Sequence, residues 1–218
     1  TTFYAVANNS GCLSSPLSVS IDFHALPAVP VVNGATYCRG DAVADLVATG
    51  TNVYWFADNT TTVNIGTGSP FASGVSNAGV TTIWFADSLA YPGITCGSDT
   101  GSVRITINNL PVINTVNATN DSASCGGLSD GNITGVTVTG NPVYTYTWSD
   151  ASGVVSTSTT TSDLLLQPAG VYTLVVTDGN TPSCPSLPAT FTISTHSNPV
   201  SPVFATSSDT VYCSGDAV

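Results

Sequence analysis

Alternating apolar and polar positions mark the strands of this chain. Residues 103–107 place Val, Ile and Ile at every second position with polar side chains between them, and residues 191–193 repeat the pattern. Residues 172–176 also place large apolar side chains at every second position, with Thr173 and Val175 between them. A period of two puts alternate side chains on opposite faces of a β-strand. We therefore predict half-buried strands, each with its large apolar side chains on the core face.

Segments containing proline and asparagine follow such strands at residues 26–30, 108–111 and 196–202. Proline ends strand pairing and stiffens a junction between domains. We predict the end of a preceding domain at 1–27, complete β-sandwiches at 28–109 and 110–196, and the start of a following domain at 197–218. A semi-rigid, rod-like array is the expected arrangement.

Repeated segments support this division. Residues 37–43 (YCRGDAV) return as residues 212–218 (YCSGDAV), and residues 1–7 are similar to residues 81–87. Repetition at domain length is typical of tandem arrays, so we expect the chain to be a window from a longer array. The two central domains are also related, because 78–87 and 169–178 share an Ala-Gly-Val start and a β run that ends at Asp.

The composition excludes ordinary amphipathic helices, because the chain contains no Glu and no Lys, which favour helix surfaces. Thr, Val, Ser, Gly and Asn suit strands and tight turns instead. The predicted fold class is all-β, with tandem Ig-like or PKD-like β-sandwiches. The net charge of −11 excludes a basic nucleic-acid footprint. No apolar stretch is long enough for membrane insertion.

Six cysteines are spread along the chain without any Cys-x-x-C pair, and only two His accompany them, which argues against zinc. The separations Cys38 to Cys96 and Cys125 to Cys184 are nearly equal and match one small sandwich. We predict these two pairs as disulfides, with Cys12 and Cys213 unpaired in this chain. Disulfides indicate export to an oxidising compartment; the alternative is six reduced thiols in a cytosolic protein.

Three blocks carry a family resemblance. Residues 125–134 (CGGLSDGNIT), 144–149 (YTYTWS) and 169–178 (AGVYTLVVTD) resemble, in this order, the SprB-type repeat of very large surface adhesins of gliding Bacteroidota. The resemblance covers roughly residues 113–195, and a PKD-like sandwich shares the Tyr-x-Tyr-x-Trp and Gly-x-Tyr elements. Residues 28–109 look like the Ig-like modules interspersed in such adhesins.

The resemblance implies a structural and adhesive repeat segment at the extracellular cell surface, exported by the type IX secretion system and active in gliding or attachment. The implied partners are neighbouring repeats of the same chain, surface polysaccharide or a solid substratum, and the gliding and secretion machinery. Two other functions stay open: a polysaccharide-binding module of a secreted protein, and a subunit of a self-assembling surface filament. No enzymatic activity is expected.

The same source implies O-glycosylation, because Bacteroidota modify a short Asp-Ser/Thr-apolar sequence. Ser88, Ser122 and Thr210 are the candidate acceptors. Three-residue patterns also arise by chance in a chain this rich in Ser and Thr. The alternative is therefore that these are ordinary strand and turn residues.

Two further sets of residues are candidates for binding. Asp41, Asp45 and Asp130 are the carboxylates that a calcium ion would use, although Asp is equally typical of turns and solvated caps. No other cofactor is expected. Trp55 and Trp84 lie in runs that are apolar on both strand faces, so one of them is predicted to be exposed for ligand contact or for packing against a neighbour.

Overall fold

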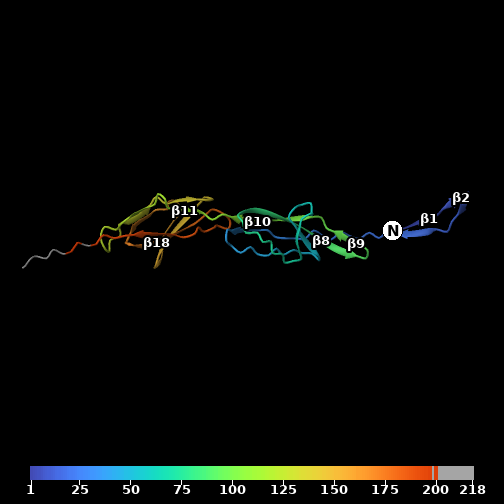
Figure 1. The fold of residues 1–218 in the computed structure, drawn as a ribbon, viewed down its shortest axis with the longest axis horizontal. Helices are drawn as coiled ribbons and strands as arrows, with labels where there is room; N and C mark the ends of the chain where they lie inside the picture. Colours follow the sequence, from blue (N-terminus) through green and yellow to red (C-terminus); the bar gives the residue numbers. More distant parts are fainter. Residues whose placement is uncertain (198, 201–218) are drawn as a thin grey trace, which may run out of the picture. The chain divides into compact units, whose positions relative to one another are not determined.

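The computed structural model describes residues 1–197 and 199–200, and this part of the chain is all-β. It forms two compact units (Figure 1). Unit 1 comprises Thr1–Asn109 and Asn180–Cys184, and unit 2 comprises Leu110–Gly179 and Pro185–Val218. Residues 180–184 therefore belong to unit 1 although they interrupt unit 2 in chain order. None of the described residues lies in a helix that could cross a membrane.

The first 27 residues of unit 1 form a long, thin hairpin. β1 pairs with β4 in antiparallel register, with Phe3 opposite Val19, and β2 pairs with β3 closer to the tip. Every strand residue is exposed, including Phe3 and Val19 at 55% and 52%. The strands are β1 (Thr2–Ala5), β2 (Asn8–Asn9), β3 (Cys12–Leu13) and β4 (Leu17–Ser20).

The rest of unit 1 is built on one large sheet in the order β5-β10-β8-β6-β7, with β9 paired to the far end of β8. β5 runs parallel to β10, and the other pairings are antiparallel. The strands are β5 (Ala35–Cys38), β6 (Val53–Phe56), β7 (Asn64–Thr67), β8 (Gly79–Tyr91), β9 (Ile94–Gly97) and β10 (Gly101–Asn108).

A second layer covers the core face of this sheet. It consists of two isolated antiparallel bridges, Val32 with Ala48 and Leu46 with Phe71. Between the layers lies a buried cluster from β6, β8 and β10, centred on Trp55, whose indole is fully buried and stacks on Phe71 at 4.9 Å between ring centroids. Its other buried members are Leu46, Val53, Ile83, Phe85, Val103, Ile105 and Ile107.

Unit 2 has the same architecture with a more complete second layer. A four-stranded sheet runs β16-β15-β18-β19, a three-stranded sheet runs β12-β13-β17, and β11 pairs with β14. The strands are β11 (Val112–Asn114), β12 (Thr119–Asp121), β13 (Gly131–Thr134), β14 (Thr137–Thr139), β15 (Thr145–Asp150), β16 (Gly153–Ser158), β17 (Leu164–Gln167), β18 (Gly170–Thr177) and β19 (Ala189–Ile193).

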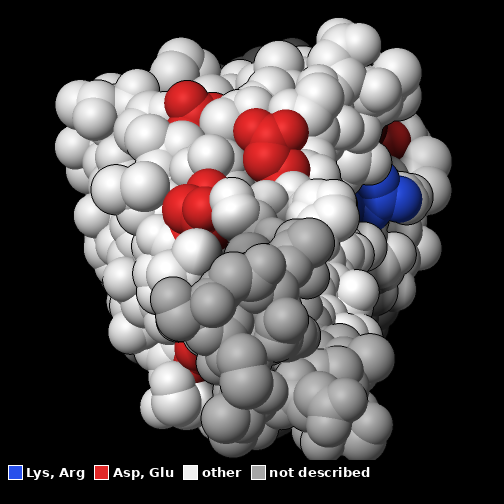
Figure 2. Space-filling view, turned by 90° about the vertical axis from the view of Figure 1, so that its left-hand side faces the viewer, with Lys and Arg blue, Asp and Glu red and all other residues white. Residues whose placement is uncertain are grey.

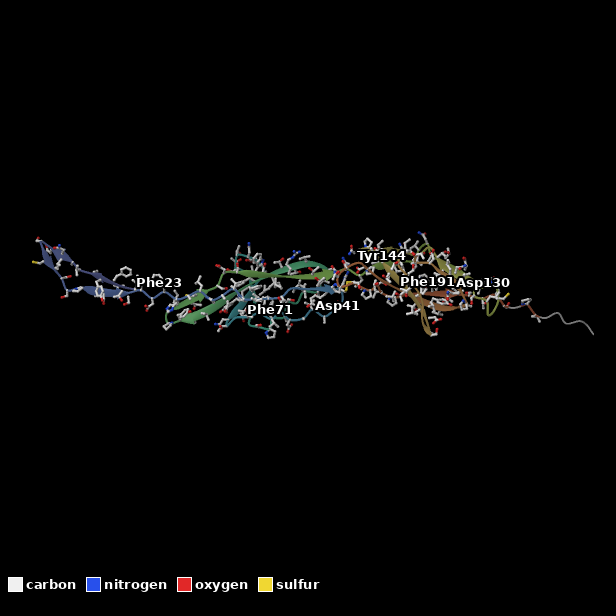
Figure 3. The ribbon with its side chains drawn as sticks, turned by 180° about the vertical axis from the view of Figure 1, so that it is seen from behind. Phe23, Asp41, Phe71, Asp130, Tyr144 and Phe191 are labelled. Carbon is white, nitrogen blue, oxygen red and sulfur yellow. A yellow bond between two sulfur atoms is a disulfide. The ribbon has the colours of Figure 1, made fainter. Side chains whose placement is uncertain are left out.

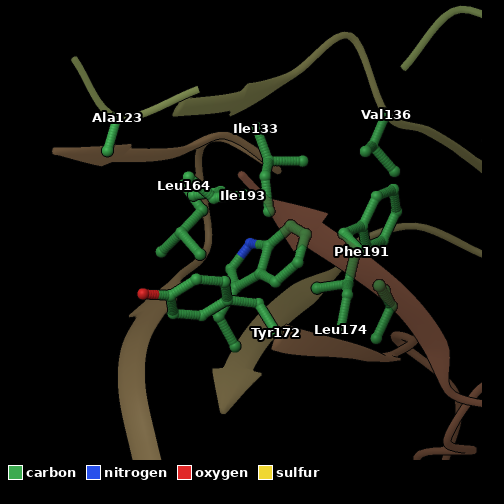
Figure 4. Packing of buried hydrophobic residues seen from close by; sticks show 10 residues of the cluster. Ala123, Ile133, Val136, Leu164, Tyr172, Leu174, Phe191 and Ile193 are labelled. Atoms are coloured by element: carbon green, nitrogen blue, oxygen red, sulfur yellow. The ribbon is translucent and has the colours of Figure 1, made fainter. Parts of the chain in front are cut away.

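The core of unit 2 lies between these sheets (Figure 4). Trp148 from β15 is 1% exposed, and its ring lies 5.1 Å from that of Phe191 on β19. The Trp148 Nε1–H donates to the carbonyl of Ser162 at 3.0 Å, so the polar end of the indole is satisfied inside the core. The remaining buried members are Ala123, Ile133, Val136, Leu164, Tyr172, Leu174, Val176 and Ile193.

Tyr172 near the start of β18 adds a feature of immunoglobulin-type sandwiches. Its ring is buried, and its hydroxyl donates to the carbonyl of Pro168 at 2.8 Å, just before the strand. That fold typically has a tyrosine whose hydroxyl bonds to the backbone of the connection just before its own strand, together with a tryptophan buried on a central strand. Unit 2 is an Ig-like β-sandwich.

The correspondence between the units extends to single side chains. Ile83 and Phe85 on β8 are buried like Leu174 and Val176 on β18. Trp55 corresponds to Trp148, and its Nε1–H donates to the carbonyl of Gly68 at 2.8 Å. The predicted all-β class with tandem Ig-like sandwiches is therefore confirmed. A main sheet whose core face is covered by a second layer occurs in both units.

Candidate functional site

The described residues contain one disulfide, and it differs from both predicted pairs. Cys38 at the end of β5 is bonded to Cys184, 146 residues further along the chain, with a Cα–Cα distance of 5.5 Å. The predicted pairs Cys38–Cys96 and Cys125–Cys184 are wrong. Cys12, Cys96 and Cys125 carry free thiols, and Cys213 lies outside the described residues.

Strand length explains why Cys38 and Cys96 cannot meet. Cys38 lies beside Asn108, at the end of β10 that faces Gly79, whereas Cys96 lies opposite Leu89 on β8. Gly79 and Leu89 are ten residues apart on one strand, which is roughly 33 Å at ~3.3 Å per residue. A disulfide requires Cα atoms about 4.4–6.8 Å apart.

The same argument applies to Cys125 and Cys184, because they lie near opposite ends of β18. Ala123, two residues before Cys125, bridges Thr195, just beyond the end of β19 that pairs with Gly170. Cys184 directly precedes Pro185, which bridges Thr177 at the other end of β18. Gly170 and Thr177 are seven residues apart, or roughly 23 Å. Equal spacing in the sequence reflected the repeat itself and not a bond within each domain.

The two tryptophans proposed for ligand contact have different surroundings. Trp55 is fully buried at the centre of the unit 1 core, so the prediction that it is a ligand-contact candidate is wrong. Trp84 lies on the opposite face of the same sheet and is half-buried. It is opposite Phe56 on one side and Ser102 on the other. Only Trp84 keeps a surface from which it could contact a ligand.

Neighbouring side chains make this outer face of unit 1 an aromatic surface, defined here by Tyr54, Phe56 and Trp84. Tyr54 is 38% exposed and lies on β6, two residues before Phe56. Phe56 is buried, yet it is not part of the core cluster, because strand alternation turns it away from Trp55. The exposed Arg104 lies on the adjacent strand β10, opposite Thr82.

A shallow hollow of about 270 Å³ adjoins Tyr54 on unit 1. It lies at the start of β6 and the end of β7, beside the loop before β6. The lining residues are Thr51, Asn52, Val53, Tyr54, Thr67 and Gly68. The backbone of this loop is held by Asp87, which is buried at the end of the core stretch of β8. The Asp87 carboxylate accepts the N–H groups of Thr51 at 3.1 Å and Asn52 at 2.7 Å.

We expect Asp87→Ala to lower the free energy of unfolding of unit 1 by about 3 kcal/mol, because the substitution leaves two loop N–H groups without their charged acceptor. Urea unfolding followed by fluorescence measures the change. The exposed Asp45 provides the control, and Asp45→Ala should alter stability by less than about 0.5 kcal/mol. Equal effects of the two substitutions would show that Asp87 has no special role.

Two of the three carboxylates predicted as calcium ligands serve local turns. Asp41 Oδ2 accepts the backbone N–H of Cys38 at 2.9 Å, and Asp130 accepts both the N–H and the hydroxyl of Ser124 (Figure 3 labels Asp41 and Asp130). Asp45 is exposed. Within residues 1–197 and 199–200, no group of three or more His, Cys, Asp or Glu side chains is arranged to hold a metal ion.

Three half-buried turn carboxylates have a lowered pKa. The Ser152 hydroxyl and then its N–H lower the pKa of Asp150, the Ser124 hydroxyl and N–H lower that of Asp130, and the Thr60 hydroxyl is the largest cause for Asp58. A folded-state pKa below the unfolded value means stability that is present above the unfolded pKa and lost as pH falls through the folded one.

We therefore expect stability to fall as the pH drops below about 4, where unfolded Asp begins to take up protons. Asp150→Asn should flatten this dependence, since an amide oxygen still accepts from Ser152 and Gly153 but does not titrate. Melting temperatures at several pH values between neutral and acid measure it, with Asp45→Asn as the matched control. An unchanged pH profile in Asp150→Asn would contradict the assignment.

The remaining candidate residues are dispersed. Ser88 and Ser122 are half-buried, and Thr210 lies outside the described residues. His24 stacks on Tyr91 with ring centroids 4.0 Å apart, and His196 Nδ1 lies 3.4 Å from the carbonyl of Ala123. These two His contacts are with an aromatic ring and a backbone oxygen, which is typical of structural residues.

Comparison with known proteins leaves the family open. No family model matches the chain, and no curated protein matches it. Solved structures to which the chain shows a distant similarity include fibronectin(III)-like modules of Clostridium thermocellum CbhA (12% identity, TM-score 0.39, 77% of this chain and 94% of that chain). Drosophila OTK extracellular domains 3–5 are 13% identical, with a TM-score of 0.41 over 86% of this chain and 69% of that chain. The eight N-terminal Ig domains of Down Syndrome Cell Adhesion Molecule are 13% identical, with a TM-score of 0.43 over 89% of this chain and 31% of that chain. Scores of this size say nothing about function.

Proposed function

We propose that the chain is a structural and adhesive segment of tandem Ig-like modules in an exported cell-surface protein. The observation that carries the proposal is the repetition of one sandwich, with Trp55 and Trp148 buried in the same way and with both indoles bonded to a backbone carbonyl. A repeated module with no metal-ligand group among its described residues fits a structural role better than a catalytic one.

The hairpin at residues 1–27 supports a third module. Phe3 lies opposite Val19 as Ile83 lies opposite Val103, and Cys12 lies opposite Asn9 as Cys96 lies opposite Leu89. The hairpin thus corresponds to the last two strands of unit 1, extended by a tip. We propose that residues 1–27 belong to a preceding Ig-like domain and residues 197–218 to a following one, with the complete sandwiches at 28–109 and 110–196.

Export is proposed from the disulfide and from the surface charge. The Cys38–Cys184 bond requires an oxidising compartment. On the face seen in Figure 2, acidic side chains lie among uncharged residues and few basic ones accompany them. With a net charge of −11, the protein repels anionic polymers at short range, so a neutral surface polysaccharide is the favoured ligand.

The aromatic surface of unit 1 is the proposed contact for that polysaccharide. Exposed aromatic rings present flat apolar faces, with a polar group at the edge of Tyr and Trp, and this combination suits the mixed surface of a sugar. Trp84 and Tyr54 provide the rings, and the hollow beside Tyr54 provides backbone polar groups.

Bead adhesion under flow tests the proposal. Beads carrying the 218-residue protein are expected to adhere to agarose, a neutral polysaccharide, more strongly than albumin-coated beads, and Trp84→Ala should remove most of the difference. Val171→Ala on β18, which is 57% exposed, is the control and should adhere like the wild type. Adhesion that is no greater than that of albumin, or that is insensitive to Trp84→Ala, would contradict the proposed surface.

The finer proposal is that the parent protein is a gliding adhesin exported by the type IX system, and it rests on the resemblance of residues 125–178 to the SprB-type repeat. It predicts O-linked glycans on Ser88, Ser122 and Thr210. Intact-mass measurement of the native protein should then show hexose-containing increments. An unmodified mass would count against this source.

A self-assembling filament is the second candidate, because the hairpin exposes both its edges and its apolar side chains. Tyr4, Leu17 and Phe23 are 72%, 69% and 83% exposed (Figure 3 labels Phe23). Unpaired edges of this kind accept a strand from another chain. An apparent molecular mass from light scattering that rises with protein concentration, and that no longer rises when residues 1–27 are removed, would favour the filament over the adhesive array.

A further inference from the structure

The five cysteines within the described residues belong to two positional classes, and the first class occupies a turn. Cys38 and Cys125 each begin a β-turn, closed by the N–H of Asp41 on Cys38 O at 3.0 Å and by that of Leu128 on Cys125 O at 3.2 Å. Two residues after each cysteine stands a glycine with a positive φ, 98° for Gly40 and 89° for Gly127. A positive φ at this position of a turn favours glycine.

Both turn cysteines lie at the end of the sandwich where its last strand finishes. Cys38 is the register partner of Asn108, the last residue of β10. Ala123, two residues before Cys125, bridges Thr195, two residues beyond the end of β19. Each turn therefore lies next to the point where the chain leaves its own module.

The second class lies in the connection between the last two strands, at the other end of the sandwich. Cys96 on β9 and Cys12 on β3 hold the same place in two hairpins, opposite Leu89 and Asn9 respectively. Cys184 lies between β18 and β19. We call Cys12, Cys96 and Cys184 the loop cysteines, and Cys38 and Cys125 the turn cysteines.

The observed disulfide joins one cysteine of each class. It joins Cys38, the turn cysteine at the end of β5, to Cys184, the loop cysteine that lies between β18 and β19 in chain order and belongs to unit 1. A bond between classes inside one sandwich is excluded by the length of the strands between them. The described residues thus contain one completed bond of this kind, and among the free cysteines are the turn cysteine Cys125 and the loop cysteine Cys96.

We propose that Cys125 and Cys96 are covalent docking sites for further modules of the same type. Cys125 takes the loop cysteine of a following module, and Cys96 takes the turn cysteine of a preceding one. The proposal rests on the serial modules of the proposed function. The sequence Cys213-Ser214-Gly215 repeats the Cys-x-Gly pattern of the turn class, although it lies outside the described residues.

The chemistry of each junction is a simple oxidation. Two thiols lose two protons and two electrons and form one S–S bond, and the electrons pass to a disulfide oxidant of the exporting compartment. Cys96 and Cys125 are partly exposed, so an incoming cysteine can reach them. Neighbouring modules are then joined by the peptide linker and by a disulfide, so that tension is carried by covalent bonds even if a module opens.

A second copy of the chain serves as the neighbouring module in the test. The 218-residue protein with Cys213→Ser, which removes the cysteine of the third Cys-x-Gly sequence, is incubated with reduced and oxidised glutathione. Its disulfides are then mapped by peptide mass spectrometry without reduction. We expect disulfide-linked multimers in which Cys125 of one copy is bonded to Cys12 or Cys96 of another, with Cys38–Cys184 intact in each.

Cys125→Ser should abolish these multimers, and Cys12→Ser combined with Cys96→Ser should do the same, while all variants keep Cys38–Cys184. Cys125–Cys125 bonds, a Cys125–Cys96 bond within a monomer, or a Cys125 thiol that persists while Cys38–Cys184 forms would overturn the proposal. The readout is independent of bead adhesion, so a failure of the adhesive function is distinguishable from a failure of this pairing rule.

Discussion

Trp148→Ala is expected to lower the free energy of unfolding of unit 2 by about 3–5 kcal/mol. The indole is almost fully buried against Phe191, so its removal leaves a cavity. The substitution also removes the donor to the carbonyl of Ser162, which lies at the edge of the core. Because a domain of this size is stable by about 5–15 kcal/mol in total, unit 2 should be close to unfolding.

Trp84→Ala is the matched control, since it removes the same side chain from a half-buried position on the outer face of unit 1. It should cost about 1 kcal/mol or less. Trp55→Ala should repeat the large effect, but in unit 1. Urea unfolding combined with residue-resolved hydrogen exchange measures which unit loses protection. Equal losses from Trp84 and Trp148 would contradict the assignment of one tryptophan to the surface and the other to the core.

Reduction of the Cys38–Cys184 disulfide is expected to produce the second large effect. The bond closes a loop with a sequence separation of 146 residues, and the chain-entropy model assigns such a loop about 5 kcal/mol of stabilisation. Reduction should therefore lower the melting temperature markedly and should release the segment 180–184 from unit 1. Thermal melts with and without a phosphine reductant measure the shift.

Single cysteine substitutions identify the bond responsible. Cys38→Ser and Cys184→Ser should each reproduce the effect of reduction, and the double variant should add nothing further. Cys96→Ser is the control, because its thiol is free and half-buried, and its melt should match that of the wild type in the oxidised state. A melt that is indifferent to reduction, or a Cys96→Ser variant as unstable as Cys184→Ser, would be incompatible with the observed pairing.

The core of both sandwiches could be predicted because alternation is a local property. Ile105 and Leu174, like their neighbours two residues away, are buried where the period of two places them. The absence of Glu and Lys removed helices from consideration, and the described residues are all-β. Burial of every second side chain is a direct consequence of strand geometry, so little tertiary information was required.

The partner of each cysteine could not be predicted from spacing alone. Cys38 and Cys96 are separated by one domain length, but that length is the period of the repeat and applies to any equivalent pair. The deciding quantity is the end of the sandwich on which each cysteine lies. The ten-residue separation of Gly79 and Leu89 along β8 places the two at opposite ends. A strand assignment for residues 79–91 would have been sufficient to reject the pair.

The exposure of Trp55 and Trp84 was equally undecidable from the sequence. Both lie in runs that are apolar at consecutive positions, so alternation does not say which face is the core. The register decides it, because Trp55 pairs with the buried Phe85 and Trp84 pairs with Phe56 on the outer face. Long-range pairing of this kind depends on the whole sheet.

Peptide mapping of the oxidised protein without reduction most directly tests the observed pairing, in which Cys38 at the end of β5 is bonded to Cys184, which lies between β18 and β19 in the chain. The account predicts a single intramolecular disulfide among the described cysteines, in a peptide pair that contains Cys38 and Cys184. Peptide pairs joining Cys38 to Cys96 or Cys125 to Cys184 would contradict it.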